Sequence, residues 1–244
     1  MKKFNYKNAW INLRLVLMLA LVTFLYSFSL KRNESRQTKK VSVEFVNNSA
    51  LYISHEAVNK LLIENGQQLK TIGQDKLVLN TLENLLNKHD MIQQSEVFVS
   101  IDGVVKAVVF QRTPIARVFN NDGSFYIDSK GSRMPLSAMQ TARLPIVVGE
   151  IDQENEKQIY EVLWLIYNDD FLKKNITGIE ILPSGSLRMT NRNYDYEIEF
   201  GKTIEIQRKF DNYKAFFQKA VRDTLIEQYK VINLKFTQQV VCTK

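Results

Sequence analysis

The sequence predicts an α+β protein with a single N-terminal transmembrane helix and two folded domains after it. Three observations predict this class: an uncharged apolar run near the N-terminus, a strand–helix–helix–strand–strand pattern that follows it, and short strands separated by turn residues from about residue 120 onward. The predicted organisation is a tail at 1–9, a transmembrane helix at 10–30, a spacer at 31–40, and domains at 41–113 and 114–244.

The apolar run covers residues 15–30 and contains no charged residue. Sixteen helical residues span about 24 Å, which is short of a hydrocarbon core of roughly 30 Å. Extension back to Trp10 gives about 31 Å and places Arg14 close enough to one end for its side chain to reach water. Trp10 and Tyr26 then lie toward the two interfaces, where amphipathic rings are favoured. We therefore expect Trp10, Arg14 and Tyr26 to anchor the helix.

The charge distribution favours a membrane protein over a nucleic-acid binder. The chain carries 33 Lys and Arg against 26 Asp and Glu, but four of the cations precede residue 15. The rest of the chain has a net charge of only +3, without the basic cluster that a nucleic-acid interface needs. Four cations precede the apolar run and five follow it, so charge alone does not decide the orientation. A signal peptide cleaved near Ser27 and Ser29 is the alternative to an anchor.

The first domain reads as strand, helix, helix, strand, strand. An alternating strand is expected at Val41–Val46, and Ser54 is a good N-cap for the helix that follows. A second helix carries an apolar stripe formed by Val78, Leu82, Leu85 and Leu86. Strands at Val97–Ile101 and Val104–Phe110 are joined by Asp102-Gly103, a strong signal for a two-residue hairpin. Both helices can bury their stripes on one face of a three-stranded sheet.

The second domain alternates short strands with turn residues at 120–123, 129–131 and 183–185. One helix is expected at 155–167, with an apolar face formed by Ile159, Val162, Leu163 and Ile166. Another is expected at 204–222, with a face formed by Ile206, Phe210, Tyr213 and Phe217. Strands at 229–236 and 238–243 close the chain. This pattern predicts a mostly antiparallel, β-rich domain with two helices.

The residues that catalysis or metal binding requires are scarce. The two histidines have structural interpretations: His55 follows an N-cap and should be exposed, and His89 falls in the last turn of a helix. Cys242 is the single cysteine and is expected to be a small buried residue on a strand. The adjacent Asp169 and Asp170 are interpreted as a helix end that meets solvent. We expect no catalytic, cofactor or metal site and no small-molecule substrate, although carboxylates assembled in space for glycan hydrolysis remain an alternative.

Several segments resemble the FtsQ/DivIB family of bacterial cell-division proteins, and the similarity extends over essentially the whole chain. The matching segments are Phe110–Val118, Phe125–Gly131, Met134–Ser137, Leu144–Gly149, Phe200–Lys202 and Val231–Phe236. Within them, Pro114 is expected at an edge position or at a bend between the two domains, and Asp128 is expected to accept backbone N–H bonds in its turn. The chain departs from the family pattern at Gln111-Arg112 and at Asn233–Lys235.

The resemblance implies a POTRA domain (β-α-α-β-β) followed by the β-rich domain, and no enzymatic activity. It implies a scaffold that links FtsB/FtsL-like bitopic division proteins and the septal peptidoglycan synthase at midcell. It also implies a single-pass protein of the inner membrane, with a cytoplasmic N-terminus, periplasmic domains and enrichment at the division septum. A POTRA-containing component of envelope assembly or lipid transport is the alternative function.

The C-terminal segment is the predicted partner site. A last strand is often an edge, and an extended partner segment can add to its unpaired backbone groups. The residues expected to carry this contact are Thr237, Gln239, Val240, Val241, Cys242 and Thr243. The alternative interpretation is that they only complete the core sheet. The edge of the POTRA sheet is a possible second docking surface, for which the sequence names no residues.

Overall fold

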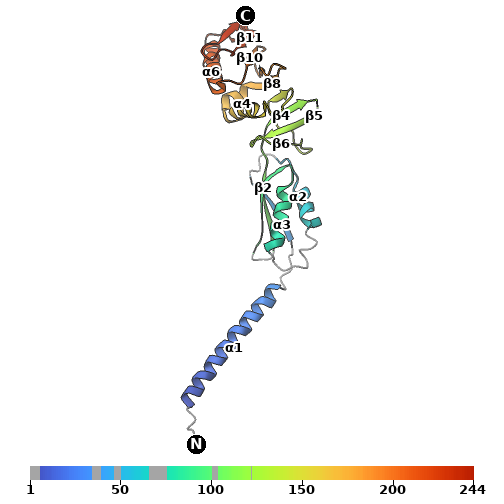
Figure 1. The fold of residues 1–244 in the computed structure, drawn as a ribbon, viewed down its shortest axis with the longest axis vertical. Helices are drawn as coiled ribbons and strands as arrows, with labels where there is room; N and C mark the ends of the chain where they lie inside the picture. Colours follow the sequence, from blue (N-terminus) through green and yellow to red (C-terminus); the bar gives the residue numbers. More distant parts are fainter. Residues whose placement is uncertain (1–5, 35–39, 47–50, 66–75, 101–103, 122) are drawn as a thin grey trace. The chain divides into compact units, whose positions relative to one another are not determined.

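The structure, a computed structural model, describes residues 6–34, 40–46, 51–65, 76–100, 104–121 and 123–244. It confirms an α+β chain with one N-terminal apolar helix (Figure 1). The chain divides into two compact units: unit 1 comprises Met1–Asn48 and Ser54–Phe110, and unit 2 comprises Ser49–Ile53 and Gln111–Lys244. The division after Phe110 lies three residues before the boundary that the sequence suggests.

The N-terminal helix α1 runs from Tyr6 to Glu34. Its segment Trp10–Lys31 has a mean hydropathy of 2.0 and is exposed along its length, so the helix is long and apolar enough to cross a membrane. The helix ends four residues after the predicted end at residue 30. Neither Gly nor Pro occurs in the segment 31–34, and no residue there terminates a helix.

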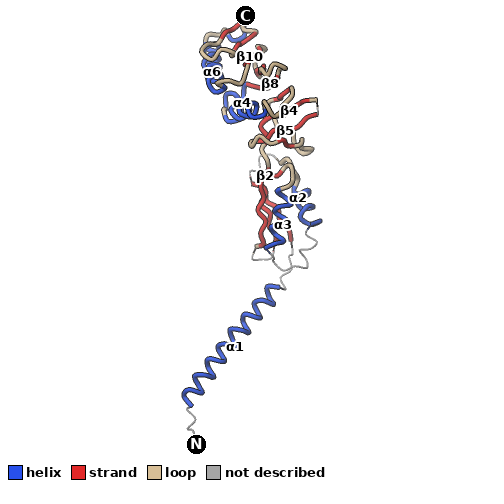
Figure 2. The backbone as a smooth tube through the Cα atoms, viewed as in Figure 1, coloured by secondary structure: helices blue, strands red, loops and turns tan. Residues whose placement is uncertain are grey.

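Unit 1 packs two helices on a three-stranded sheet (Figure 2). Its elements are β1 (Lys40–Val46), α2 (His55–Asn65), α3 (Lys76–Asn87), β2 (Ile92–Val99) and β3 (Val104–Gln111). The strand order is β1-β3-β2, with β1 parallel to β3. The predicted cap of α2 is confirmed, because Ser54 Oγ accepts a 3.0 Å hydrogen bond from the backbone N–H of Ala57. The helices bury apolar side chains that include Val58, Leu62, Leu82 and Leu86.

Strand β2 begins five residues before the predicted start at Val97. The polar run Gln93–Glu96 hides this part of the strand from an apolar pattern. Ser95 occupies an inward position and is buried, and its N–H and its hydroxyl both bond to Asn87 Oδ1, at 2.7 and 2.9 Å. A serine whose polar groups are hydrogen-bonded therefore occupies an inward position of the strand, where the alternating pattern predicts an apolar residue. The predicted Asp102-Gly103 turn lies outside the described residues.

Unit 2 is built on one nine-stranded mixed sheet with the order β12-β11-β10-β9-β8-β7-β4-β5-β6. The strands are β4 (Pro114–Asn120), β5 (Gly123–Asp128), β6 (Arg133–Met134), β7 (Ile146–Val148), β8 (Ile176–Ile181), β9 (Leu187–Asn191), β10 (Glu197–Gly201), β11 (Val231–Asn233) and β12 (Val241–Thr243). The pairs β4/β7, β7/β8 and β10/β11 are parallel and the other five are antiparallel. Pro114 is the first residue of β4 and lies next to a register shift, a position where a proline is tolerated; β4 itself lies inside the sheet, between β7 and β5.

The helices of unit 2 are α4 (Glu156–Asn168), α5 (Asp170–Asn175), α6 (Ile206–Arg222) and the short 3₁₀ helix η2 (Ile226–Gln228). The predicted apolar face of α4 is confirmed, because Ile159, Val162, Leu163 and Ile166 are all buried. These helices pack against one face of the sheet through a continuous row of paired residues. The row runs across seven strands as Val118, Val147, Ile179, Met189, Ile198, Ile232 and Cys242. The residues before and after each member of this row point to the opposite face.

Asp169 and Asp170 lie at the end of a helix, as interpreted, because Asp169 is the C-cap of α4 and Asp170 is exposed, but Asp169 has a further structural role. Asp169 is the N-cap of α5, where its side chain accepts a 2.9 Å bond from the N–H of Leu172. It also forms an ion pair with Lys214 of α6. Burial acts to raise the pKa of Asp169, but the hydrogen bonds from Lys214 and Leu172 outweigh it and lower this pKa overall. The aspartate therefore connects α5 to α6.

The two terminal strands are shorter than predicted, with β11 at Val231–Asn233 and β12 at Val241–Thr243. A turn interrupts the expected run, because Asn233 Oδ1 accepts the N–H of Lys235 at 2.9 Å. The Asn212 side chain then bonds the carbonyl of Thr237 at 3.0 Å. Both contacts draw the backbone out of the ladder between the two strands.

Candidate functional site

Strand β12 forms one edge of the nine-stranded sheet. It pairs only with β11 in the sheet order, through the antiparallel partners Val231 with Thr243, Ile232 with Cys242, and Asn233 with Val241. An edge strand presents backbone N–H and C=O groups to which another extended segment can bond. The segment that the sequence suggests as a partner site thus includes an edge strand.

The side chains of the segment divide between the two faces of the sheet. Cys242 continues the row of core residues, and Val240 also packs against the core. Cys242 lies on a strand as expected, but it is half-buried rather than buried, and burial raises the pKa of its thiol. Val241, which is 42% exposed, and Thr243 point to the opposite face. A strand added to β12 would therefore meet Val241 and Thr243 on one face and Cys242 on the other.

The other two predicted residues lie before the strand. Thr237 is half-buried, and its carbonyl accepts the bond from Asn212. Gln239 is exposed. Both belong to the connection between β11 and β12, so all the predicted residues lie within the segment 237–243, which ends in the edge strand.

The connection that leads to β12 is held against β10. Lys235 Nζ lies 2.7 Å from Glu199 Oε2, and the N–H of Leu234 donates to the Glu199 carbonyl at 2.9 Å. Gly201 has a φ of +74°, and a Cβ there would lie 2.7 Å from Lys235 Cγ. Only glycine fits this close approach. These contacts hold the start of the connection against β10. They therefore help to determine the path of the chain toward the edge strand β12.

Lys209 supports this region from α6, and sequence reasoning missed it. Its side chain is only 2% exposed and donates to the carbonyls of Phe200 and Lys202, at 2.9 and 2.7 Å. Burial lowers the pKa of Lys209, and the nearby Glu205 opposes this effect. The available signal was position: Lys209 lies between Ile206 and Tyr213 on the apolar face of the helix.

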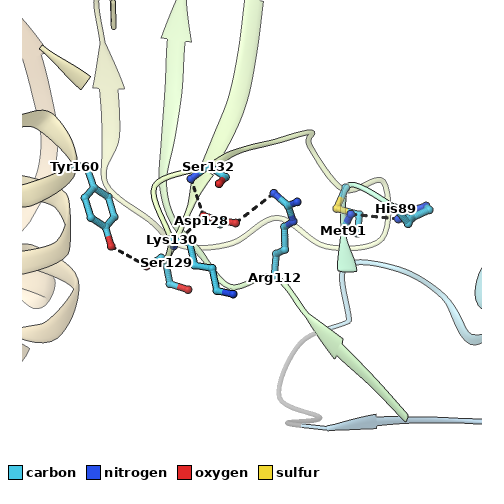
Figure 3. A network of polar contacts seen from close by, with 8 residues as sticks. All are labelled: His89, Met91, Arg112, Asp128, Ser129, Lys130, Ser132 and Tyr160. Carbon is cyan, nitrogen blue, oxygen red and sulfur yellow. Dashed lines mark hydrogen bonds and ion pairs between the residues drawn. The ribbon is translucent and has the colours of Figure 1, made fainter. Parts of the chain in front are cut away.

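A second polar network organises the start of the sheet around Asp128 (Figure 3). Asp128 is 3% exposed, and its Oδ1 accepts the N–H groups of Lys130 and Ser132 at 2.9 and 2.8 Å, as expected from the turn chemistry. Arg112 Nη1 lies 3.4 Å from its Oδ2. The hydroxyl of Tyr160 donates to the carbonyl of Ser129 at 2.9 Å and so joins the turn to α4.

The two histidines have local roles. His55 is exposed, as expected, and stands edge-on to Phe45 with ring centroids 4.6 Å apart. His89 follows α3 rather than lying in its last turn, and its Nδ1 accepts the N–H of Met91 at 3.2 Å (Figure 3). Within the part of the chain that the structure describes, no group of three or more His, Cys, Asp or Glu side chains is placed to hold a metal ion.

The expected anchor residues Trp10, Arg14 and Tyr26 all lie within the apolar segment of α1. Trp10 and Tyr26 are exposed on the helix surface, toward opposite ends of this segment. Their role at a membrane interface stays a prediction.

Comparison with known proteins gives one family and a similar solved structure. Residues 113–243 match the family described as FtsQ/DivIB, C-terminal related. A similar structure is the major extracytoplasmic domain of the trans isomer of the bacterial cell division protein DivIB from Geobacillus stearothermophilus. It is 15% identical, with a TM-score of 0.32, and the match covers 46% of this chain and 96% of that one. None of the curated proteins matches the chain.

Proposed function

The chain belongs to the FtsQ/DivIB, C-terminal related family, and on that basis we propose that it is a non-catalytic scaffold of bacterial cell division. The family match supports a role in division. The finer proposal is that the protein holds FtsB/FtsL-like bitopic proteins, and through them the septal peptidoglycan synthase, at midcell. It does so by protein–protein contacts and needs no cofactor.

In this proposal, α1 crosses the inner membrane once, with the N-terminus in the cytoplasm and units 1 and 2 in the periplasm. The length and apolar character of Trp10–Lys31 support the anchor. Unit 1 acts as a POTRA domain, an assignment supported by its order of strand, two helices and two strands. Unit 2 carries the partner site.

The observation that carries the partner site is the position of β12 at the edge of the sheet of unit 2. We expect a partner segment to pair with β12 as a tenth strand. Main-chain hydrogen bonds would then supply affinity, and the alternation of Val241 and Thr243 with Cys242 would fix the register. The ion pair between Lys235 and Glu199 holds the segment that leads to β12 in place before the partner binds.

A localisation experiment tests the proposal. A cytoplasmic fluorescent protein fused before Met1 should give a band at midcell in living cells before constriction becomes visible. The matched control carries a fluorescent protein that does not mature outside the cytoplasm, fused after Lys244, and should stay dark. A uniform envelope signal from the first fusion would contradict the division role and favour envelope assembly or lipid transport. A bright second fusion would contradict the orientation.

A further inference from the structure

Unit 2 contains a groove of about 900 Å³ at the end of the sheet where β4, β7 and β8 finish. These three strands are parallel neighbours, so their carboxyl ends lie along the same margin of the sheet. The loops that follow the strands form the walls, and the first turn of α4 closes one side. A crevice beyond the carboxyl ends of parallel strands is a common place for a ligand to bind.

The lining of the groove includes apolar side chains beside its polar ones. Phe119 and Val148 are paired across β4 and β7 and point to the face opposite the helices, whereas Ile181 packs toward the core at the end of β8. Val148 is 50% exposed although it lies on a central strand. An exposed aliphatic side chain in the middle of a sheet leaves apolar surface that a partner can cover.

The rim is acidic. Glu150, Asp152 and Glu154 line it, and no Lys or Arg occurs among the described residues that form the lining. Two of the carboxylates are already fixed. Glu150 Oε1 accepts the N–H of Asn121 at 3.1 Å, and Asp152 Oδ1 accepts the N–H groups of Glu154 and Asn155 at 2.9 and 3.0 Å. The negative charges are therefore held in place before any ligand arrives.

Close contacts at Gly149 hold the ends of the strands that line the groove. Gly149 has a φ of +124°, and a Cβ there would lie 2.8 Å from the carbonyl oxygen of Ile181. Its N–H donates to the carbonyl of Phe119 at 3.1 Å, so the ends of the three strands meet at this glycine. These contacts therefore hold the ends of the three strands together before a ligand binds.

We propose that this groove binds an extended segment of a partner protein in which basic residues alternate with aliphatic ones. Charge complementarity selects the basic residues, because three carboxylates at the rim repel anionic ligands. The exposed Val148 side chain and its neighbour Phe119 select the aliphatic residues. A glycan would need an open aromatic face, and the guanidinium of Arg117 already stands over the Phe119 ring, 4.7 Å from its centroid. The site uses no residue of β12 and is independent of the division role.

The test measures binding of a fluorescent six-residue peptide, in which three lysines alternate with three valines, to the full chain in neutral detergent micelles. Anisotropy should show binding that weakens as salt is raised. Replacement of Glu154 by Lys should weaken binding about fivefold, because a rim charge is reversed. The matched control, Glu161→Lys, makes the same charge change at an exposed position farther along α4 and should stay within about twofold of the parent.

A second variant, Val148→Arg, replaces the exposed apolar side chain of the lining by a cation and should also weaken binding, while Val241→Pro should leave it unchanged. Equal effects of Glu154→Lys and Glu161→Lys would overturn the proposal, because the attraction would then be nonspecific. Equal binding of a peptide with glutamates in place of the lysines would overturn it too. Binding of a neutral glycan oligomer in place of the basic peptide would assign the groove to a different ligand. Loss of midcell localisation with peptide binding retained would count against the division role alone.

Discussion

The ammonium group of Lys209 contacts Phe200 twice, through a 2.9 Å hydrogen bond to its carbonyl oxygen and through its ring, whose centroid lies 4.9 Å away. Phe200 belongs to β10 and Lys209 to the helix that follows it. The contact therefore fastens α6 to the strand on which β11 and β12 are built. A buried lysine is costly unless its donors are used, and here two backbone carbonyls accept them.

Replacement of Lys209 by Met should lower the free energy of unfolding at neutral pH by about 1–3 kcal/mol, because two carbonyls lose their donor. The loss should grow as pH rises toward 10.5. Burial lowers the pKa of Lys209 in the folded chain, so the unfolded chain binds more protons between the two pKa values and parent stability rises there. Denaturant unfolding at several pH values measures both effects. The exposed-site control, Lys202→Met, should show no such growth.

Replacement of Asp128 by Ala should cost about 1–3 kcal/mol, because the N–H groups of Lys130 and Ser132 lose their acceptor in a buried turn. Asp128→Asn keeps one acceptor oxygen and should cost less. Fluorescence of Trp164 can follow the unfolding of unit 2, since this residue stacks on Tyr160, which bonds to the turn. Trp10→Phe in the background removes the second tryptophan. Equal losses for the two Asp128 variants would show that the charge, rather than the acceptor oxygen, stabilises the turn.

Two glycines allow strain to be separated from steric conflict. Gly149 and Gly185 both have positive φ, but a Cβ at Gly185 would meet nothing within 4 Å, whereas at Gly149 it would meet Ile181 at 2.8 Å. Gly185→Ala should therefore cost about 1 kcal/mol, from backbone strain alone. Gly149→Ala should cost about 3 kcal/mol or more, since neighbouring backbone must also move. Urea unfolding measures the loss of stability in each variant. Similar losses would mean that β8 can move away from the added Cβ at no cost in free energy.

Replacement of Val241 by Pro should reduce recovery of the bitopic partner in pull-downs by about tenfold or more, because proline removes a backbone donor from the edge strand. Val241→Thr keeps the donor and the preference for a strand and should retain the partner. Circular dichroism checks that both variants fold. Full recovery of the partner with Val241→Pro would rule out β12 as the docking strand.

Cys242 reports on the same edge because it is the single cysteine of the chain. Burial raises the pKa of its thiol, so alkylation by iodoacetamide at pH 8 should be slower in the folded protein than in denaturant. A partner strand on β12 should slow the reaction further, and Val241→Pro should remove that protection. An alkylation rate that the partner leaves unchanged would place its contact elsewhere.

Local patterns predicted the elements whose signals lie within a few residues. The apolar spacing in α4 identified its four buried residues, and Ser54 identified the start of α2. The same patterns did not predict elements in which a polar side chain forms hydrogen bonds inside the fold. Ser95 hid the first half of β2, and Asp169, which ends α4, also begins α5, a helix that the sequence did not predict. In both cases a side-chain hydrogen bond, which leaves no periodic trace, decides the local structure.

The sequence likewise predicted one part of the candidate site and not the rest. The C-terminal position of the last strand suggested an edge, and the structure places β12 at one. Sequence reasoning did not separate Val241 from Cys242, because the face that a strand presents depends on its register with β11. The acid-rimmed groove was missed altogether. Its walls come from loops that meet only because β4, β7 and β8 are parallel neighbours, and such pairing is non-local.

Three residue pairs join β11 to β10, and α6 forms the connection between these parallel strands. Displacement of this connection would release β11 and β12 together while β4 to β9 kept their own ladder. We expect such sub-global opening to govern hydrogen exchange of the β12 amides, at a free energy below that of global unfolding. A bound partner would then slow this exchange by stabilising the closed form, so occupancy of the edge could be followed amide by amide.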